Sequence, residues 1–207
     1  MAKVNSTDGS ITGLIGSLVF VNFNGKKYVR RAPRTRSKKS WSEGQAAYRK
    51  KFSEMCALWT GSIPGKTRQI WKFAAEGMNG FNLFVKTNMP AFGSDGKICD
   101  WERFHFSAGK LPLPHQLRAN RAVGDPEKVE VSWQNDSDSG LSSTHDELMM
   151  VVVRDGKFTT PIATGALRKQ GNAVIQLPSG TGALQGIYLF FGHKQEELYS
   201  VDQYFGI

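Results

Sequence analysis

The stretch that decides how the chain begins to fold is residues 18–52, LVFVNFNGKKYVRRAPRTRSKKSWSEGQAAYRKKF. Two short runs rich in β-forming residues flank Asn24-Gly25, a dipeptide that favours the two positive-φ positions of a type I′ turn. The pattern predicts strands at 18–23 and 26–31. An isolated hairpin is marginal in water, so it must pack on the rest of the protein or join a neighbour's sheet. The two-residue loop pairs Phe23 with Lys26, Val21 with Tyr28 and Val19 with Arg30 on one face, and Phe20 with Val29 on the other.

The same stretch concentrates the positive charge of the chain. The segment 26–51 has eleven Lys or Arg and one acid, Glu43, for a charge of +10. The whole chain has 27 basic and 18 acidic residues and a net charge of +9, so the remainder sums to −1. We expect a polyanion or an acidic protein surface to bind here. The candidate binding residues are Arg30, Arg31, Arg34, Arg36, Lys38 and Lys39.

A cationic linker and a helix follow the hairpin. Residues 32–40 lack apolar periodicity, which predicts an exposed linker. Ser40 or Ser42 is the expected N-cap of the helix, which should end at Gly61. One apolar stripe at helical spacing should contribute to the core: Tyr48, Phe52, Met55, Cys56 and Trp59.

Two further helices should complete the N-terminal half. Pro64 suits the first turn of the second helix, whose apolar side runs up to Gly77. The third helix is expected over residues 80–88. Short connections predict that the three helices pack on each other as antiparallel neighbours.

The C-terminal part changes from a helical to a two-residue apolar period, which is typical of strands. Val129, Val131 and Trp133 alternate with polar residues, and 148–153 and 187–191 are continuous apolar runs between turn sequences. This pattern predicts a small antiparallel sandwich and an α+β fold class. The expected domains are a glycine-rich arm at 1–17, a hairpin and helical region at 18–92, a surface connector at 93–120 and a β-sandwich at 121–207.

No stretch of the sequence spells out a catalytic or cofactor site. The segment 61–67 ends in Gly-Lys-Thr, but its glycines are four apart and Pro64 removes an amide donor. A helix-loop-helix turn therefore fits it better than a phosphate loop. We expect no catalytic residue, no cofactor and no small-molecule substrate, and hence a protein that is not an enzyme.

The residue types that bind metals do not cluster in metal-binding patterns, so we expect no metal. A loop rich in acids can be compared with calcium sites, but it lacks the spacing of an EF-hand loop: Asp136, Asp138, Asp146 and Glu147. The histidines are scattered and are interpreted as surface or edge residues: His105, His115, His145 and His193. The cysteines are interpreted as free, mostly buried thiols: Cys56 and Cys99.

Targeting signals are not apparent in the sequence. The apolar run at 11–21 is shorter than a bilayer span and lacks a cleavage site after it. We therefore expect no signal peptide, no membrane partner, and synthesis in the cytoplasm, where the protein stays unless it is incorporated into a particle.

Several segments together carry a resemblance to a known family. The N-terminal ones are GSITGLIGSLVFVNFNGKKYVRRAP at 9–33, QAAYRKKF at 45–52 and IWKFAAEGMNGFNLFVKTN at 70–88. Their order resembles an uncharacterised family of Bacteroidetes proteins, a domain of unknown function. In that family a glycine-rich opening and a G-x-x-Y-V-R-x-x-P hairpin precede a Q-x-x-x-R-x-x-F helix. The closing strands are similar too, in VEVSWQN, GALRKQGN, IQLP and SVDQYFG.

A second resemblance concerns the C-terminal region alone. With Trp133 on an early strand and Tyr188 on a late one, it is similar to an immunoglobulin or fibronectin type III sandwich. Neither resemblance implies a catalytic residue. A similar layout in phage-encoded proteins points towards a part in particle structure.

Two functions from different classes are consistent with these features. The first is a non-enzymatic structural or assembly protein of a phage or phage-like particle. Its arm and hairpin would extend onto neighbouring protein subunits in a homo-oligomer or larger assembly. The alternative is a nucleic-acid-binding protein that uses the basic segment 26–51. A solvated basic run that only aids solubility is the plainest interpretation of the charge.

Overall fold

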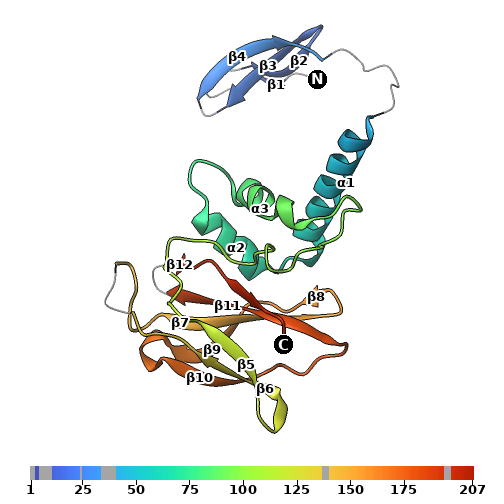
Figure 1. Cartoon of the computed structure of the whole chain (residues 1–207). Coiled ribbons are helices and arrows are strands. Elements are labelled where there is room, and N and C mark those ends of the chain that lie inside the picture. Colours follow the sequence, from blue (N-terminus) through green and yellow to red (C-terminus); the bar gives the residue numbers. More distant parts are fainter. Residues whose placement is uncertain (1–2, 5–10, 24, 34–40, 137–139, 194–196) are drawn as a thin grey trace. The chain divides into compact units, whose positions relative to one another are not determined.

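The computed structural model describes the chain except for residues 1–2, 5–10, 24, 34–40, 137–139 and 194–196 (Figure 1). The chain divides into two compact units, Met1–Trp41 and Ser42–Ile207. Helices and antiparallel strands are both present, so the predicted α+β class is confirmed. The boundaries expected near residues 92 and 120 lie inside the second unit.

The first unit is a small antiparallel sheet with the strand order β1-β2-β3-β4. The predicted hairpin is confirmed to the residue, including all four predicted cross-strand pairs. Gly25 has φ +74°, a left-handed conformation that glycine adopts without strain. Asn24 lies outside the described residues. The strands are β1 (Lys3–Val4), β2 (Ile11–Ile15), β3 (Leu18–Phe23) and β4 (Lys26–Arg31).

The second unit begins with helices that start near their predicted positions. Ser42 is the N-cap of the first, and it exchanges hydrogen bonds with Gln45 in a capping box. Pro64 precedes the second helix as its N-cap, and the third spans the predicted residues. The helices are α1 (Glu43–Ala57), the π-helical turn η1 (Leu58–Ser62), α2 (Gly65–Ala74), α3 (Gly80–Asn88) and the 3₁₀ turn η2 (Met89–Ala91).

The predicted apolar stripe of α1 is only partly a core stripe. Met55 is fully buried, whereas the Tyr48 and Phe52 side chains are 64% and 46% exposed. The interpretation of Tyr48 and Phe52 as core residues is therefore wrong. The N-terminal half of α1 extends away from the sheet that the other helices cover (Figure 1). Phe52 meets Phe81 of α3 edge-on, with ring centres 6.1 Å apart, but stays half-exposed.

The strands of the second unit form two antiparallel sheets. The smaller has the order β10-β6-β5, and the larger is built around the long central pair β7 and β11. These strands are β5 (Arg118–Ala122), β6 (Asp125–Ser132), β7 (Glu147–Arg154), β8 (Lys157–Phe158), β9 (Ile162–Leu167), β10 (Asn172–Gln176), β11 (Leu184–His193), β12 (Leu198–Tyr199) and β13 (Gln203–Phe205), with the 3₁₀ turn η3 (Arg168–Gln170) after β9.

Two apolar clusters cover the two faces of the larger sheet. The larger sheet lies between the smaller sheet and the helices α2 and α3 (Figure 1). Alternate side chains of β7 and β11 pack towards the smaller sheet, and the others pack towards α2 and α3. Both faces are buried, which explains why 148–153 and 187–191 are continuous apolar runs rather than alternating ones. The first cluster includes Val129, Val131, Leu148, Met150, Leu189 and Phe191, and the second includes Trp71, Phe84, Phe104, Phe106, Val151 and Phe190.

Part of the predicted surface connector is instead core. Phe104, Phe106 and Ser107 are fully buried. The buried side chain of Asn88 makes this possible, because it donates to the carbonyl of His105 at 3.1 Å and accepts from its N–H at 2.7 Å. The loop backbone therefore keeps its hydrogen bonds inside the protein.

Candidate interaction surface

The sheet of the first unit is not built around a core of its own. None of the described side chains between residues 11 and 33 is buried. Two-residue loops join β2 to β3 and β3 to β4, so the sheet is fixed by local turns and main-chain pairing. An antiparallel sheet of this size normally requires a covered apolar face to be stable.

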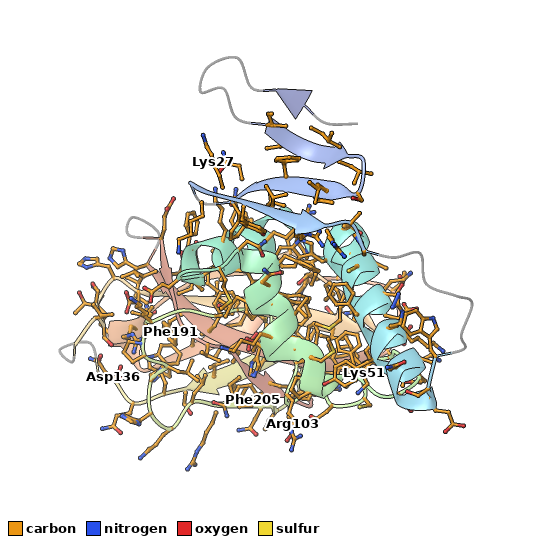
Figure 2. All side chains as sticks on the ribbon, turned by 90° about the horizontal axis from the view of Figure 1, so that it is seen from above. Lys27, Lys51, Arg103, Asp136, Phe191 and Phe205 are labelled. Atoms are coloured by element: carbon orange, nitrogen blue, oxygen red, sulfur yellow. The ribbon has the colours of Figure 1, made fainter. Side chains whose placement is uncertain are left out.

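Large apolar side chains stand on both faces of this sheet, and Figure 2 shows them as sticks on the ribbon. The strand register assigns them, since directly opposite residues share a face. Three of them on face A and four on face B are between 41% and 65% exposed. Most half-buried antiparallel sheets are apolar on one face only. Face A has Leu14, Val19, Val21, Phe23 and Tyr28, and face B has Ile11, Ile15, Leu18, Phe20 and Val29.

Strand β4 is one edge of the sheet. The N–H of Ala32 donates to the carbonyl of Ser17 at 2.7 Å, which continues the β3–β4 ladder by one pair. Hydrogen-bonded pairs alternate along an antiparallel ladder, so Arg30 and Tyr28 bond inward to β3. The main-chain groups of Val29 and Arg31 therefore point away from β3. No hydrogen bond joins them to another described residue.

The exposed cations of β4 lie at its two ends. Arg30 and Arg31, both predicted to bind, are exposed at the C-terminal end of the strand. Lys26 and Lys27 are exposed at its start and were not among the predicted residues. The alternation of a strand places one cation of each pair on each face of the sheet. The other predicted binding residues lie outside the described part of the chain: Arg34, Arg36, Lys38 and Lys39.

The second unit also carries an exposed apolar surface, on α1. Tyr48 and Phe52 line a shallow groove together with Cys56 and Met89, and Arg49 borders it. The thiol of Cys56 is free, as is that of Cys99, which confirms that neither forms a disulfide. Cys99 is exposed, however, so the expectation that both thiols are mostly buried is wrong for it.

The acids that were compared with a calcium site have a different role. Asp146 is fully buried and lies 2.9 Å from the Nε of Arg168, whose side chain is also fully buried. Arg168 donates from Nη1 to Asp136 at 2.5 Å and from Nη2 to the carbonyl of Pro112 at 2.6 Å. Its guanidinium lies 4.7 Å from the ring centre of Phe191. Asp136 and Asp146 thus neutralise the buried Arg168. Asp138 lies outside the described residues.

One of the predicted surface histidines is part of a buried network. The Nδ1 of His105 lies 2.6 Å from the Oδ1 of Asp202, a carboxylate that is 4% exposed. Asp202 also accepts the main-chain N–H groups of Phe106 and Ser107. The bond with Asp202 raises the pKa of His105 above its usual value, although burial acts in the opposite direction.

Two searches of the described residues concern other kinds of site. No group of three or more His, Cys, Asp or Glu is arranged to hold a metal ion in the part of the chain that the structure describes. Within the same part, the helices are too short or too polar to cross a membrane.

Comparison with known proteins gives one match. A family model described as a family of unknown function, DUF6266, matches residues 10–205. The match is consistent with the resemblance of the sequence to an uncharacterised family. Neither a curated protein nor a solved structure matches the chain.

Proposed function

We propose a non-enzymatic structural role, in an assembly of protein subunits, for this chain, which belongs to the DUF6266 family of unknown function. The N-terminal sheet binds neighbouring subunits, which include further copies of this chain. The second unit folds around its own two apolar clusters and serves as the body of the subunit.

The observation that carries this proposal is the exposure of apolar side chains on both faces of the N-terminal sheet. Complete burial of a large apolar side chain is worth about 1.5–3 kcal/mol. Seven of these side chains are about half exposed, and burying the exposed half of each would contribute about 1 kcal/mol apiece. A neighbouring subunit that covers a face therefore stabilises both the sheet and the contact. The seven are Leu14, Phe23 and Tyr28 on face A, and Ile11, Ile15, Leu18 and Val29 on face B.

A phage or phage-like particle is the assembly that we propose. Support comes from the resemblance in layout to phage-encoded proteins and from an N-terminal segment that requires a neighbour to complete it. In this proposal the chain is made in the cytoplasm and becomes incorporated into the particle. The immunoglobulin or fibronectin type III likeness of the C-terminal strands and the Bacteroidetes origin stay predictions. The packing of Trp133 on Phe191, with ring centres 5.4 Å apart, supports the former.

Sedimentation velocity of the full chain at increasing concentration tests the proposal. We expect reversible self-association that is weakened by Tyr28→Thr on face A or Ile15→Thr on face B, since threonine keeps the strand and removes apolar area. Val123→Thr is the matched control, because Val123 is 99% exposed on the second unit. A chain that stays monomeric at every concentration, with its N-terminal sheet resistant to protease, would contradict the proposal.

Nucleic-acid binding is the second candidate function. The four exposed cations of β4 favour it, since each one that meets a phosphate releases a counterion. Binding to DNA or RNA should then weaken steeply with salt. The slope should fall when alanine replaces the predicted residues Arg30, Arg31, Arg34, Arg36, Lys38 and Lys39. Binding that keeps its slope in this variant would exclude the segment as the site.

A further inference from the structure

We propose that the outer edge of β4 binds an extended acidic strand of a different subunit, which adds to the sheet as a fifth strand. This inference rests on the proposed function and specifies the chemistry of one partner. It concerns the edge of the sheet, whereas self-association concerns its faces.

The outer edge of β4 has main-chain groups available for pairing. The bond from Ala32 to Ser17 sets the phase of the ladder, so Val29 and Arg31 direct their N–H and C=O groups outward. An exposed strand edge is a template for another strand, and proteins use it to bind extended peptides. The six residues of β4 are long enough to pair with such a strand.

The order of side chains along β4 indicates the charge of the strand that would pair with it. The sequence Lys26-Lys27-Tyr28-Val29-Arg30-Arg31 reads cation, cation, apolar, apolar, cation, cation. Opposite charges on directly opposite residues of paired strands stabilise the pair. The complementary strand therefore has two acids, two apolar residues and two acids. Because this order is symmetric, it fits β4 in the parallel and the antiparallel direction.

The same pattern of charges disfavours pairing between two copies of this chain. Two copies of β4 that pair about a twofold axis must set outward-bonding residues opposite each other, as in the register with Val29 opposite Val29. This register places Lys27 opposite Arg31 twice, and like charges directly opposite each other are destabilising. Among the described strands of this chain, the most acidic is β6, and it is already paired on both edges, with β5 and β10. The pattern thus favours a strand from a chain of different sequence.

The positions of the cations on β4 favour a peptide strand over a nucleic acid as its partner. Alternation puts one lysine and one arginine on each face of the sheet. Surfaces that bind single-stranded nucleic acid track the backbone along one charged groove with stacked aromatic residues. A paired strand also alternates its side chains between the two faces, so it meets all four cations. The observations therefore favour the peptide.

Fluorescence anisotropy with the full chain tests this inference. The probe is a labelled, end-capped peptide with a central Glu-Glu-Val-Val-Glu-Glu, and the control is the same peptide N-methylated at alternate residues. N-methylation keeps the charge and removes the donors that strand pairing requires. We expect the control to bind at least about tenfold more weakly, since two or three main-chain hydrogen bonds are lost. Equal binding of both peptides would overturn the inference.

Variants of the protein give a second, independent test. Val29→Pro removes an outward N–H, a change that edge strands tolerate, and should abolish peptide binding. Val29→Ala keeps this N–H and should retain binding. Two results together would assign β4 to nucleic acid instead. Single-stranded DNA of the same total charge would displace the peptide, and the Val29→Pro variant would bind the peptide as tightly as the wild type. If the peptide does not bind while the wild-type chain still self-associates in sedimentation velocity, the inference is overturned. The proposed function is then unaffected.

Discussion

His105 and Asp202 are 97 positions apart in the sequence, and their side chains meet with 2.6 Å between Nδ1 and Oδ1. The same carboxylate accepts the N–H groups of Phe106 and Ser107, and the Ser107 hydroxyl donates to the carbonyl of Ser200 at 2.7 Å. The loop after η2 is thereby fastened to the segment between β12 and β13. We expect this contact to make the stability of the second unit depend on pH.

The sign of the pH dependence follows from the raised pKa of His105. Protonated His105 pairs with the Asp202 carboxylate in the folded state, so the stabilisation is present below the unfolded-state pKa of His105, about 6.5. It extends down to the pH at which Asp202, whose pKa burial raises, takes up a proton. It is lost as the pH rises through the higher folded-state pKa. Urea unfolding at a series of pH values through the pKa of His105 measures this loss. The free energy of unfolding of the wild type should exceed that of His105→Gln by an amount that shrinks as the pH rises. An advantage that is constant, or that grows with pH, would refute the pairing.

Removal of the buried arginine should destabilise the second unit strongly. Arg168→Met leaves the buried carboxylate of Asp146 without its cation, and breaking a buried ion pair in this way costs about 3–5 kcal/mol. Lys169→Met is the matched control, because Lys169 is exposed and should change the free energy of unfolding by less than about 0.5 kcal/mol. Urea unfolding of both variants measures the difference. Equal stability of the two would show that Arg168 and its acids contribute little.

A methyl group at Gly109 should also be costly. A Cβ built there would lie 2.0 Å from the carbonyl oxygen of Tyr199, which also accepts the N–H of Leu111. The backbone has to shift to admit alanine, and overpacking of this kind costs about 1–3 kcal/mol. Gly65→Ala, at the start of α2, is the control, since nothing lies within 4 Å of its Cβ position. The prediction fails if thermal unfolding gives Gly109→Ala the same midpoint as the control.

Features set by local sequence were predictable. The hairpin was placed to the residue because Asn24-Gly25 fixes a two-residue turn, and the turn fixes the register. The start of α1 was predicted at Ser40 or Ser42, and the structure has Ser42 as the N-cap, in a capping box with Gln45. The continuous apolar runs of β7 and β11 identified strands buried on both faces.

Features that depend on distant partners were not predictable in the same way. Nothing near His105 in the sequence indicates Asp202, and nothing near Asp146 indicates Arg168. The stripe of α1 had the spacing of a core helix, but periodicity does not show how far the surface beneath a helix extends, and Tyr48 is exposed. For the candidate surface, the sequence indicated Arg30 and Arg31 by their charge. The exposure of apolar side chains on both faces of the N-terminal sheet became apparent only in the structure.

Hydrogen–deuterium exchange of the full chain, measured by mass spectrometry from dilute to concentrated solution, tests the central claim most directly. If neighbouring subunits complete the N-terminal sheet, the amides of β2, β3 and β4 gain protection as the concentration rises. Those of β7 and β11 are protected at every concentration, because their unit contains its own core. The claim would be contradicted if the amides of β2–β4 were already as protected in dilute solution as those of β7 and β11, and if this protection did not change with concentration.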